Sequence, residues 1–253
     1  MNRKPFIAGN WKMHKTIAEA VSLVNAILLN LPDPQEIDVA VAPPFTALAA
    51  VAEAIKDTPL KLSAQNLFWE KEGAYTGEIS PLMLKDVGCE YVIIGHSERR
   101  QYFGETNEMI NKKVKAALTF GLKPILCVGE RLEEREEGKT FEVVKRQLLG
   151  GLAGLAPEEV LKTTIAYEPV WAIGTGKTAS PTQAQEVHAF LRNLLTKNWS
   201  KEIAQKVRIL YGGSIKPENI KVLMQEEDVD GGLVGGASLK AESFVRICNF
   251  KGD

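Results

Sequence analysis

The run YVIIGHSERR, residues 91–100, joins a short apolar segment to an abrupt polar end. Residues 91–94 are continuously apolar and lack the polar–apolar alternation of a strand with one face in water. A glycine and then five polar residues follow directly. This pattern predicts a parallel strand that is buried on both faces and carries polar side chains at its carboxyl end.

Seven further apolar runs divide the chain at similar intervals. They are FIAGN from Phe6, IDVAVA from Ile37, LKLSA from Leu60, KPILCV from Lys123, TTIAYE from Thr163, VRILYGG from Val207 and GLVGG from Gly232. Eight units over the chain average about 32 residues each, the size of one strand–helix unit. An open, doubly wound sheet would show the same alternation, but the count of eight favours closure. We predict a single α/β domain over residues 1–253, a (β/α)8 barrel of eight parallel strands surrounded by helices.

Helix-start signals lie between these runs. Thr16 and Glu19, and again Thr182 and Gln185, have the spacing of a capping box. Thr106 is placed to cap a helix that Gly121 ends. These signals support helices between consecutive strands.

Composition narrows the class of protein. The 253 residues are 45% hydrophobic and 25% charged, with a formal net charge of −1. This balance is typical of a soluble globular protein and does not favour nucleic acid or an anionic membrane as partner. No apolar run approaches about 18 residues and the start of the chain does not resemble a signal peptide, so we expect a cytoplasmic protein. Free, buried thiols are expected at Cys89, Cys127 and Cys248, and the histidines lack the spacing of metal ligands.

Ionisable side chains follow three of the predicted strands. Asn10 and Lys12 follow the first, His96 and Glu98 the fourth, and Glu168 the sixth. Each has an ordinary structural interpretation, such as an ion pair or a surface charge. In a barrel, however, all of these positions lie at the carboxyl-terminal end, where barrel enzymes carry their active sites.

These residue types suit proton transfer next to a carbonyl group. Glu168, whose direction the following Pro169 restricts, can act as a general base. A neutral His96 at the start of a helical turn can donate a hydrogen bond to a carbonyl oxygen, and Lys12 can supply positive charge.

Glycines mark the last two predicted strands. YGGS at 211–214 and LVGGAS at 233–238 allow a ligand to approach the backbone closely. Tight turns alone would explain either stretch. Together, and without a nearby cluster of Arg or Lys, they favour a phosphate held by main-chain N–H groups.

The stretch WAIGTGKT, residues 171–178, is similar to two nucleotide-binding motifs but fits neither. A phosphate-binding Walker loop needs a glycine where Trp171 stands. Gly174, Gly176 and Ala179 match the dinucleotide pattern, but no acidic residue ends a following strand at the expected distance. A loop that closes over the site is the better interpretation.

The segment QNLFWEKEGAYTGEIS, residues 65–80, is predicted to be a long loop that exposes Phe68, Trp69 and Tyr75. Large apolar side chains on such a loop indicate a contact surface, and a second subunit is the simplest partner.

Six stretches together resemble the triosephosphate isomerase family. In chain order they are AGNWKMH, QN…GAYTGE, VIIGHSERR, AYEPVWAIGTGK, YGGSIKPEN and DGGLVGGASL, between about Lys4 and Leu239. Other phosphate-binding barrels share the late glycines but not the remaining motifs.

The resemblance implies a TIM barrel that interconverts dihydroxyacetone phosphate and D-glyceraldehyde 3-phosphate through an enediolate, without a cofactor or metal, in glycolysis and gluconeogenesis. By this resemblance Glu168 is the base, His96 the neutral electrophile and Lys12 a source of charge. Asn10 orients the enediolate, and Glu98 supports His96 and Lys12.

The resemblance also implies the rest of the site. The expected phosphate-binding residues are Asn10, Lys12, Gly174, Ser214, Gly235 and Gly236. The expected lid comprises Pro169, Val170, Trp171, Ala172, Ile173, Gly174, Thr175, Gly176 and Lys177. The loop near Thr76 is expected to dock into the active site of a partner subunit in a homodimer, with no nucleic acid or membrane partner.

Two other functions remain open from the residues alone. An aldolase or synthase on a phosphate-binding barrel would need a Schiff-base lysine, for which Lys12 is the candidate at this end. A non-catalytic barrel would serve as a binding or scaffold protein, although the set of ionisable residues is intact.

Overall fold

The computed structural model describes residues 3–172 and 179–252. Within them, eight strands pair in parallel and in chain order, and β8 pairs back with β1, so the barrel is closed. The predicted (β/α)8 fold is confirmed. The strands are β1 (Phe6–Asn10), β2 (Asp38–Ala42), β3 (Lys61–Ala64), β4 (Tyr91–Ile94), β5 (Lys123–Val128), β6 (Thr164–Tyr167), β7 (Ile209–Tyr211) and β8 (Gly231–Val234).

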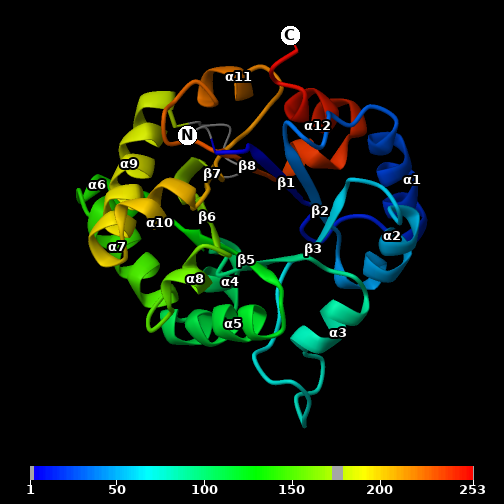
Figure 1. Ribbon diagram of the computed structural model, residues 1–253, viewed down its shortest axis with the longest axis horizontal. Helices are drawn as coiled ribbons and strands as arrows, with labels where there is room; N and C mark the ends of the chain where they lie inside the picture. Colours follow the sequence, from blue (N-terminus) through cyan, green and yellow to red (C-terminus); the bar gives the residue numbers. More distant parts are fainter. Residues whose placement is uncertain (1–2, 173–178, 253) are drawn as a thin grey trace.

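Helices form an outer ring around the strands (Figure 1). The α-helices are α1 (Ile17–Leu28), α2 (Leu48–Ala54), α3 (Pro81–Asp86), α4 (Ser97–Tyr102), α5 (Asn107–Thr119), α6 (Leu132–Glu136), α7 (Thr140–Gly151), α8 (Pro157–Val160), α9 (Pro181–Asn198), α10 (Lys201–Lys206), α11 (Ile220–Leu223) and α12 (Ala241–Cys248). Short 3-10 helices are η1 (Phe45–Ala47), η2 (Val170–Ala172) and η3 (Gly236–Leu239).

The strands are buried on both faces, as their continuous apolar runs predict. One set of side chains fills the barrel interior, and the alternate set packs between the barrel and the helices. In β1, for example, Phe6 and Ala8 belong to the interior cluster and Ile7 to the outer one. Because the interior is packed, a ligand can reach the barrel only at its ends.

Two of the three predicted helix starts are confirmed. Thr106 caps α5 by accepting a hydrogen bond from the Met109 amide, and Glu19 accepts one from the amide of Thr16. The predicted Thr182 box is wrong, because α9 begins two residues earlier with Ser180 as its cap. Proline is favoured at the first helical position, which is where Pro181 stands.

The segment between β3 and α3 extends outward from the ring of helices (Figure 1). Residues 70–78 are exposed, and Tyr75 retains 44% of its accessible surface. Phe68 and Trp69 are only half-buried rather than exposed, since their rings stack 4.1 Å apart and Tyr75 lies 4.5 Å from Phe68. The prediction of three exposed aromatic side chains therefore holds fully for Tyr75 alone.

The cysteines Cys89, Cys127 and Cys248 are buried and free, as predicted. Burial raises the pKa of the Cys89 thiol to about 12, so it stays protonated at neutral pH. Every helix in the described ranges is too short or too polar to serve as a transmembrane span.

Candidate active site

One cavity of about 430 Å³ at the carboxyl ends of the strands brings together most of the predicted site residues. Side chains from the ends of β1, β4 and β6 face the glycine stretches that follow β7 and β8. The predicted residues that line it are Asn10, Lys12, His96, Glu168, Gly212, Gly213, Ser214, Gly235 and Gly236. Residues far apart in the chain thus share one concave surface.

Glu168 is buried at the end of β6, with 1% of its surface exposed. Its Oε2 atom accepts a 2.9 Å hydrogen bond from the Ser97 amide at the start of α4. Its Oε1 atom lies 3.0 Å from Nε2 of His96 but lacks the alignment of a hydrogen bond. The carboxylate therefore rests against α4, and one of its oxygens is free to accept a proton.

His96 is the N-cap residue of α4. Its Nδ1 atom accepts a 3.2 Å hydrogen bond from the Glu98 amide, so Nδ1 carries no proton. The hydrogen of this tautomer is on Nε2, the atom that lies 3.0 Å from Oε1 of Glu168.

Lys12 adopts a strained backbone conformation, with a φ angle of +52°. Two side chains hold it: Asn10 Oδ1 accepts from the Lys12 amide at 3.0 Å, and Gln65 Nε2 donates to the Lys12 carbonyl at 2.8 Å. The same Gln65 nitrogen donates to the Ala42 carbonyl. The ammonium group of Lys12 lies 2.5 Å from Oε1 of Glu98. These contacts fix the direction in which Lys12 enters the cavity.

A buried thiol, that of Cys127, and a half-buried guanidinium, that of Arg100, lie near Glu168. Arg100 donates to the carbonyls of Gly95 and Cys127. Burial lowers its pKa, and the negative charge of Glu168 partly opposes this effect. Burial raises the pKa of the Cys127 thiol well above its usual value, and Glu168 raises it further. The group beside the carboxylate is therefore a neutral thiol, which adds no second negative charge.

Two glycines next to Glu168 stand where a larger residue would crowd it. A Cβ atom on Gly212 would lie 2.9 Å from Cγ of Glu168, and one on Gly129 would lie 1.7 Å from the Glu168 carbonyl oxygen. Lys216 and Lys240 also line the cavity. Together with Lys12 they put three lysines in this cavity, so the expectation of no nearby cluster of Arg or Lys is wrong.

The start of the predicted lid contacts a buried carboxylate. Glu130 is fully buried, and its Oε1 accepts hydrogen bonds from Trp171 Nε1 at 2.9 Å and Tyr167 Oη at 3.1 Å. The Val170 amide donates to the Glu130 carbonyl. Residues 173–177 of the predicted lid, including the phosphate-binding candidate Gly174, lie outside the described residues.

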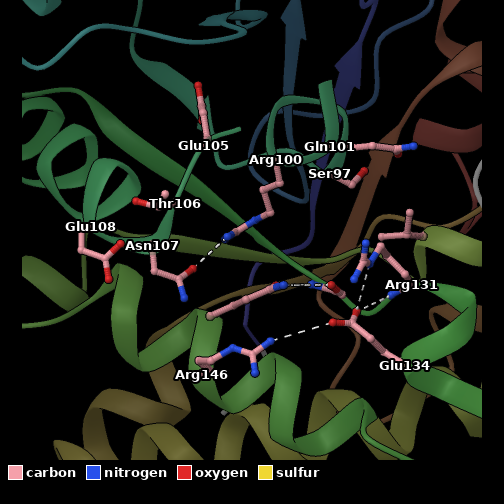
Figure 2. Close-up of a pocket in the computed structure, with 13 residues that line it drawn as sticks. Ser97, Arg100, Gln101, Glu105, Thr106, Asn107, Glu108, Arg131, Glu134 and Arg146 are labelled. Carbon is pink, nitrogen blue, oxygen red and sulfur yellow. Dashed lines mark hydrogen bonds and ion pairs between the residues drawn. The ribbon is translucent and has the colours of Figure 1, made fainter. Parts of the chain in front are cut away.

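A second cavity, of about 470 Å³, lies between α4, α5 and α7 (Figure 2). Its arginines are paired within the wall: Arg100 donates to Asn107, and Arg146 and Arg131 both lie near Glu134. No histidine or lysine of the described part of the chain lines it. The larger cavity thus lacks the combination of base, imidazole and ammonium group that the 430 Å³ cavity has.

Comparison with known proteins agrees with this geometry. Residues 5–251 match the family model described as Triosephosphate isomerase. The chain belongs to the triosephosphate isomerase family. It is 62% identical to the triosephosphate isomerase of Carboxydothermus hydrogenoformans over 97% of this chain and 98% of that protein. It is 58% identical to the triosephosphate isomerase of Caldanaerobacter subterraneus subsp. tengcongensis, over 98% of this chain and all of that protein. It is 56% identical to the triosephosphate isomerase of Trichlorobacter lovleyi, over 99% of this chain and all of that protein.

Membership of this family establishes the reaction. The protein is an isomerase that interconverts dihydroxyacetone phosphate and D-glyceraldehyde 3-phosphate, a step of glycolysis. The isomerase is thereby favoured over the aldolase and the non-catalytic barrel that the residues alone left open.

Several contacts in the site were not predicted from the sequence. The Ser97 amide that holds Glu168 is a backbone group, so no residue type reveals it. Gln65 belongs to the predicted loop 65–80 and to the stretch QN…GAYTGE. Neither pattern predicts that its side chain donates to the carbonyls of Lys12 and Ala42. A signal did exist for Lys216 and Lys240, since each follows a pair of glycines within five residues.

Proposed function

We propose that Glu168 is the catalytic base of this isomerase and that His96 is its electrophile. The observation that carries the proposal is their position in one cavity, with Oε1 of Glu168 3.0 Å from Nε2 of His96. Both side chains are almost fully buried, so water competes little for them.

The proposed reaction moves one proton between neighbouring carbons. Glu168 removes a proton from C1 of dihydroxyacetone phosphate while the Nε2–H group of His96 donates a hydrogen bond to the carbonyl oxygen. The electron pair of the broken C–H bond forms the enediolate. Glu168 then returns its proton to C2, while the hydroxyl proton on O1 is transferred to O2 through His96, which gives D-glyceraldehyde 3-phosphate. Since Glu168 rests beside His96, bound substrate has to displace its carboxylate from that position.

Lys12, Asn10 and Glu98 support this step. The ammonium group of Lys12 offsets negative charge on the enediolate and the phosphate. Asn10 orients the substrate and fixes the Lys12 backbone through its 3.0 Å hydrogen bond. Glu98 contacts both partners, with its Oε2 atom 3.6 Å from Nδ1 of His96 and its Oε1 atom beside Lys12.

The phosphate group is proposed to lie against the glycine stretches. Ser214, Gly235 and Gly236 line the cavity at the ends of β7 and β8, where backbone N–H groups can approach an anion. Gly235 lies beside Lys12, since a Cβ atom there would make an ordinary contact of 3.7 Å with the Lys12 Cε atom.

A shortened base tests the assignment of Glu168. The variant Glu168→Asp withdraws the carboxylate by one methylene, which should lower kcat roughly a hundredfold or more with little change in KM. A coupled assay with D-glyceraldehyde 3-phosphate measures it, and Glu186→Asp, on the exposed face of α9, is the matched control. Near-normal turnover by Glu168→Asp would refute the role.

We propose in addition that the protein is a homodimer, formed through the loop at 65–80 with Thr76 reaching the partner's cavity. Support comes from the outward extension of this loop (Figure 1) and from the exposure of several apolar side chains. Beside Tyr75, Met83 in α3 is 52% exposed and Met13 in the loop after β1 is 94% exposed. Such groups usually become buried in an interface.

A charged substitution on this surface tests the dimer. We expect Met83→Glu to sediment as a monomer at micromolar concentration, whereas Val222→Glu, on α11 and 45% exposed, should sediment as the unchanged protein does. A monomer in the unchanged protein, or a dimer that tolerates Met83→Glu, contradicts the proposal.

Two broader expectations also stay proposals. We place the protein in the cytoplasm, where glycolysis runs and free thiols such as Cys89 persist; cell fractionation checks this. We treat residues 1–253 as a single domain, since β1 pairs with β8 and so joins the two ends of the chain. One cooperative unfolding transition in urea is the expected result.

A further inference from the structure

A cavity of about 500 Å³ lies at the opposite end of the barrel from the active site. Its wall includes the first residues of four strands: Asp38 in β2, Tyr91 in β4, Lys123 in β5 and Thr164 in β6. Since the strands are parallel, their first residues mark the amino-terminal end. The volume falls within the range of small-molecule sites in proteins.

The charge of this cavity is unlike that of the whole chain. Among residues 3–172 and 179–252, six cationic side chains line it against one carboxylate, Asp38, although the net charge of the chain is −1. The cations come from residues that are distant in sequence and that the barrel brings together. They are Arg3, Lys4, Lys123, Lys162, Lys206 and Arg208.

Two of these cations are matched by neighbouring carboxylates. Arg3 lies 2.5 Å from Asp230, and Lys206 lies 2.7 Å from Glu202. Their charges therefore add little to the field inside the cavity.

Lys4 and Arg208 share a single carboxylate. Each lies 2.6 Å from one oxygen of Asp38. Burial alone would raise the pKa of Asp38, but its hydrogen bonds to Lys4 and Arg208 outweigh burial and lower it. One carboxylate for two cations leaves one positive charge without a counterion.

Lys123 and Lys162 bring two more unbalanced charges. Lys123 shares Glu90 with Lys61, so again two cations meet one carboxylate. Lys162 is exposed and forms no ion pair within residues 3–172 and 179–252. Together with the surplus at Asp38, the local excess is three positive charges.

We propose that this cavity binds a small polyphosphate anion, either free or as the phosphate chain of a nucleotide. A chain of two or three phosphates carries roughly enough negative charge to balance the excess positive charge of the cavity. Arg208 supplies a fixed donor group, since its guanidinium packs 4.5 Å from the Phe6 ring and is held by Asp38. Lys123 and Lys162 are exposed and can turn toward the anion. The site is separate from the isomerase cavity and does not depend on its mechanism.

Calorimetric titration tests the proposal. Tripolyphosphate and ATP are added separately to the full-length protein at constant ionic strength, in the presence of saturating glycerol 3-phosphate to occupy the active site. We expect binding in both arms if the phosphate chain is recognised wherever it occurs. Tighter binding of tripolyphosphate indicates free polyphosphate, and tighter binding of ATP indicates a nucleotide.

Charge-neutral variants locate the site. The double variant Lys123→Gln/Lys162→Gln should weaken binding roughly tenfold or more, because it removes two of the three unbalanced charges. Lys145→Gln, an exposed position on α7 outside the cavity, should change it less than about twofold. The double variant and Lys145→Gln should both keep the isomerase activity of the unchanged protein. Absence of binding by the unchanged protein, equal binding by the double variant, or loss of binding when glycerol 3-phosphate is present overturns the proposal.

Discussion

The backbone N–H group of Ser97 donates a 2.9 Å hydrogen bond to Oε2 of Glu168. This contact joins the first residue of α4 to the residue after β6, which lies 71 positions later. It also sets the carboxylate 3.0 Å from His96 Nε2, so one helix start positions both proposed catalytic groups. The resting position of the base thus depends on a backbone group rather than on a side chain.

Proline at position 97 removes this donor with little other change. Ser97 is the first residue of α4, where proline is favoured, and His96 has φ −50° and ψ 141°, which a following proline allows. We expect Ser97→Pro to fold and to lose roughly tenfold or more in kcat/KM, because the ring displaces Glu168. Ser97→Ala keeps the N–H group and should stay within about threefold of the unchanged protein. Equal activity of the two variants in the coupled assay would count against a positioning role.

The side chain of Gln65 offers a second test, at the strained Lys12. Gln65→Met keeps the approximate size but removes the Gln65 donor from the carbonyls of Lys12 and Ala42, of which Ala42 keeps its hydrogen bond from the Trp11 amide. We expect a loss of about 1–3 kcal/mol in the free energy of unfolding, measured in urea, together with a lower kcat/KM. Gln35→Met, in an exposed turn, is the control. Reduced stability with unchanged kinetics would show that Gln65 supports the fold but not the direction of Lys12.

The barrel could be predicted from sequence because each strand carries its own signal. The run KPILCV, residues 123–128, is apolar after its first residue and forms β5 with those bounds. Glu168 and His96 were recognisable for a related reason, since a polar residue directly after a buried strand must lie at the barrel end.

Other features were missed because the local sequence offers competing signals or does not show how neighbouring side chains pack. The start of α9 was misplaced because Thr182 and Gln185 have capping-box spacing, while Ser180 and Pro181 form the actual start. The half-burial of Phe68 arises from stacking on Trp69 within the loop, which composition does not reveal. Such arrangements follow from packing, not from propensity.

Gly212 provides a prediction about space beside the base. An alanine Cβ there would lie 2.9 Å from Cγ of Glu168 and 3.1 Å from the Tyr167 carbonyl oxygen, so the flexible carboxylate side chain has to move. We expect Gly212→Ala to fold and to lower kcat roughly tenfold or more in the coupled assay. Gly252→Ala is the control. A Cβ atom there would lie 3.6 Å from the Asn249 carbonyl oxygen, an ordinary contact, so this variant should have normal turnover. Normal kcat for Gly212→Ala would mean that the space beside Glu168 does not limit the movement of its carboxylate to the substrate.

His188 on α9 predicts how stability depends on pH. Its side chain is completely buried, and Nδ1 lies 3.0 Å from the Asp228 carbonyl oxygen. Burial lowers the pKa of His188 from 6.5 to about 4 in the folded protein. Between these values the unfolded chain binds a proton that the folded protein does not. The contribution of His188 is therefore fully present above pH 6.5 and is lost as the pH falls toward 4.

Replacement of this histidine should remove that dependence. The shift corresponds to at most about 3 kcal/mol, so the free energy of unfolding should fall by up to that amount more in the unchanged protein than in His188→Gln between pH 7 and 4. Urea unfolding at several pH values measures this difference. The carboxylates are the same in both proteins, so their contributions to the pH dependence cancel. His14→Gln, at an exposed position, should follow the unchanged protein throughout. Parallel curves for His188→Gln and the unchanged protein would show that the buried imidazole accepts a proton in the folded state nearly as readily as in the unfolded chain.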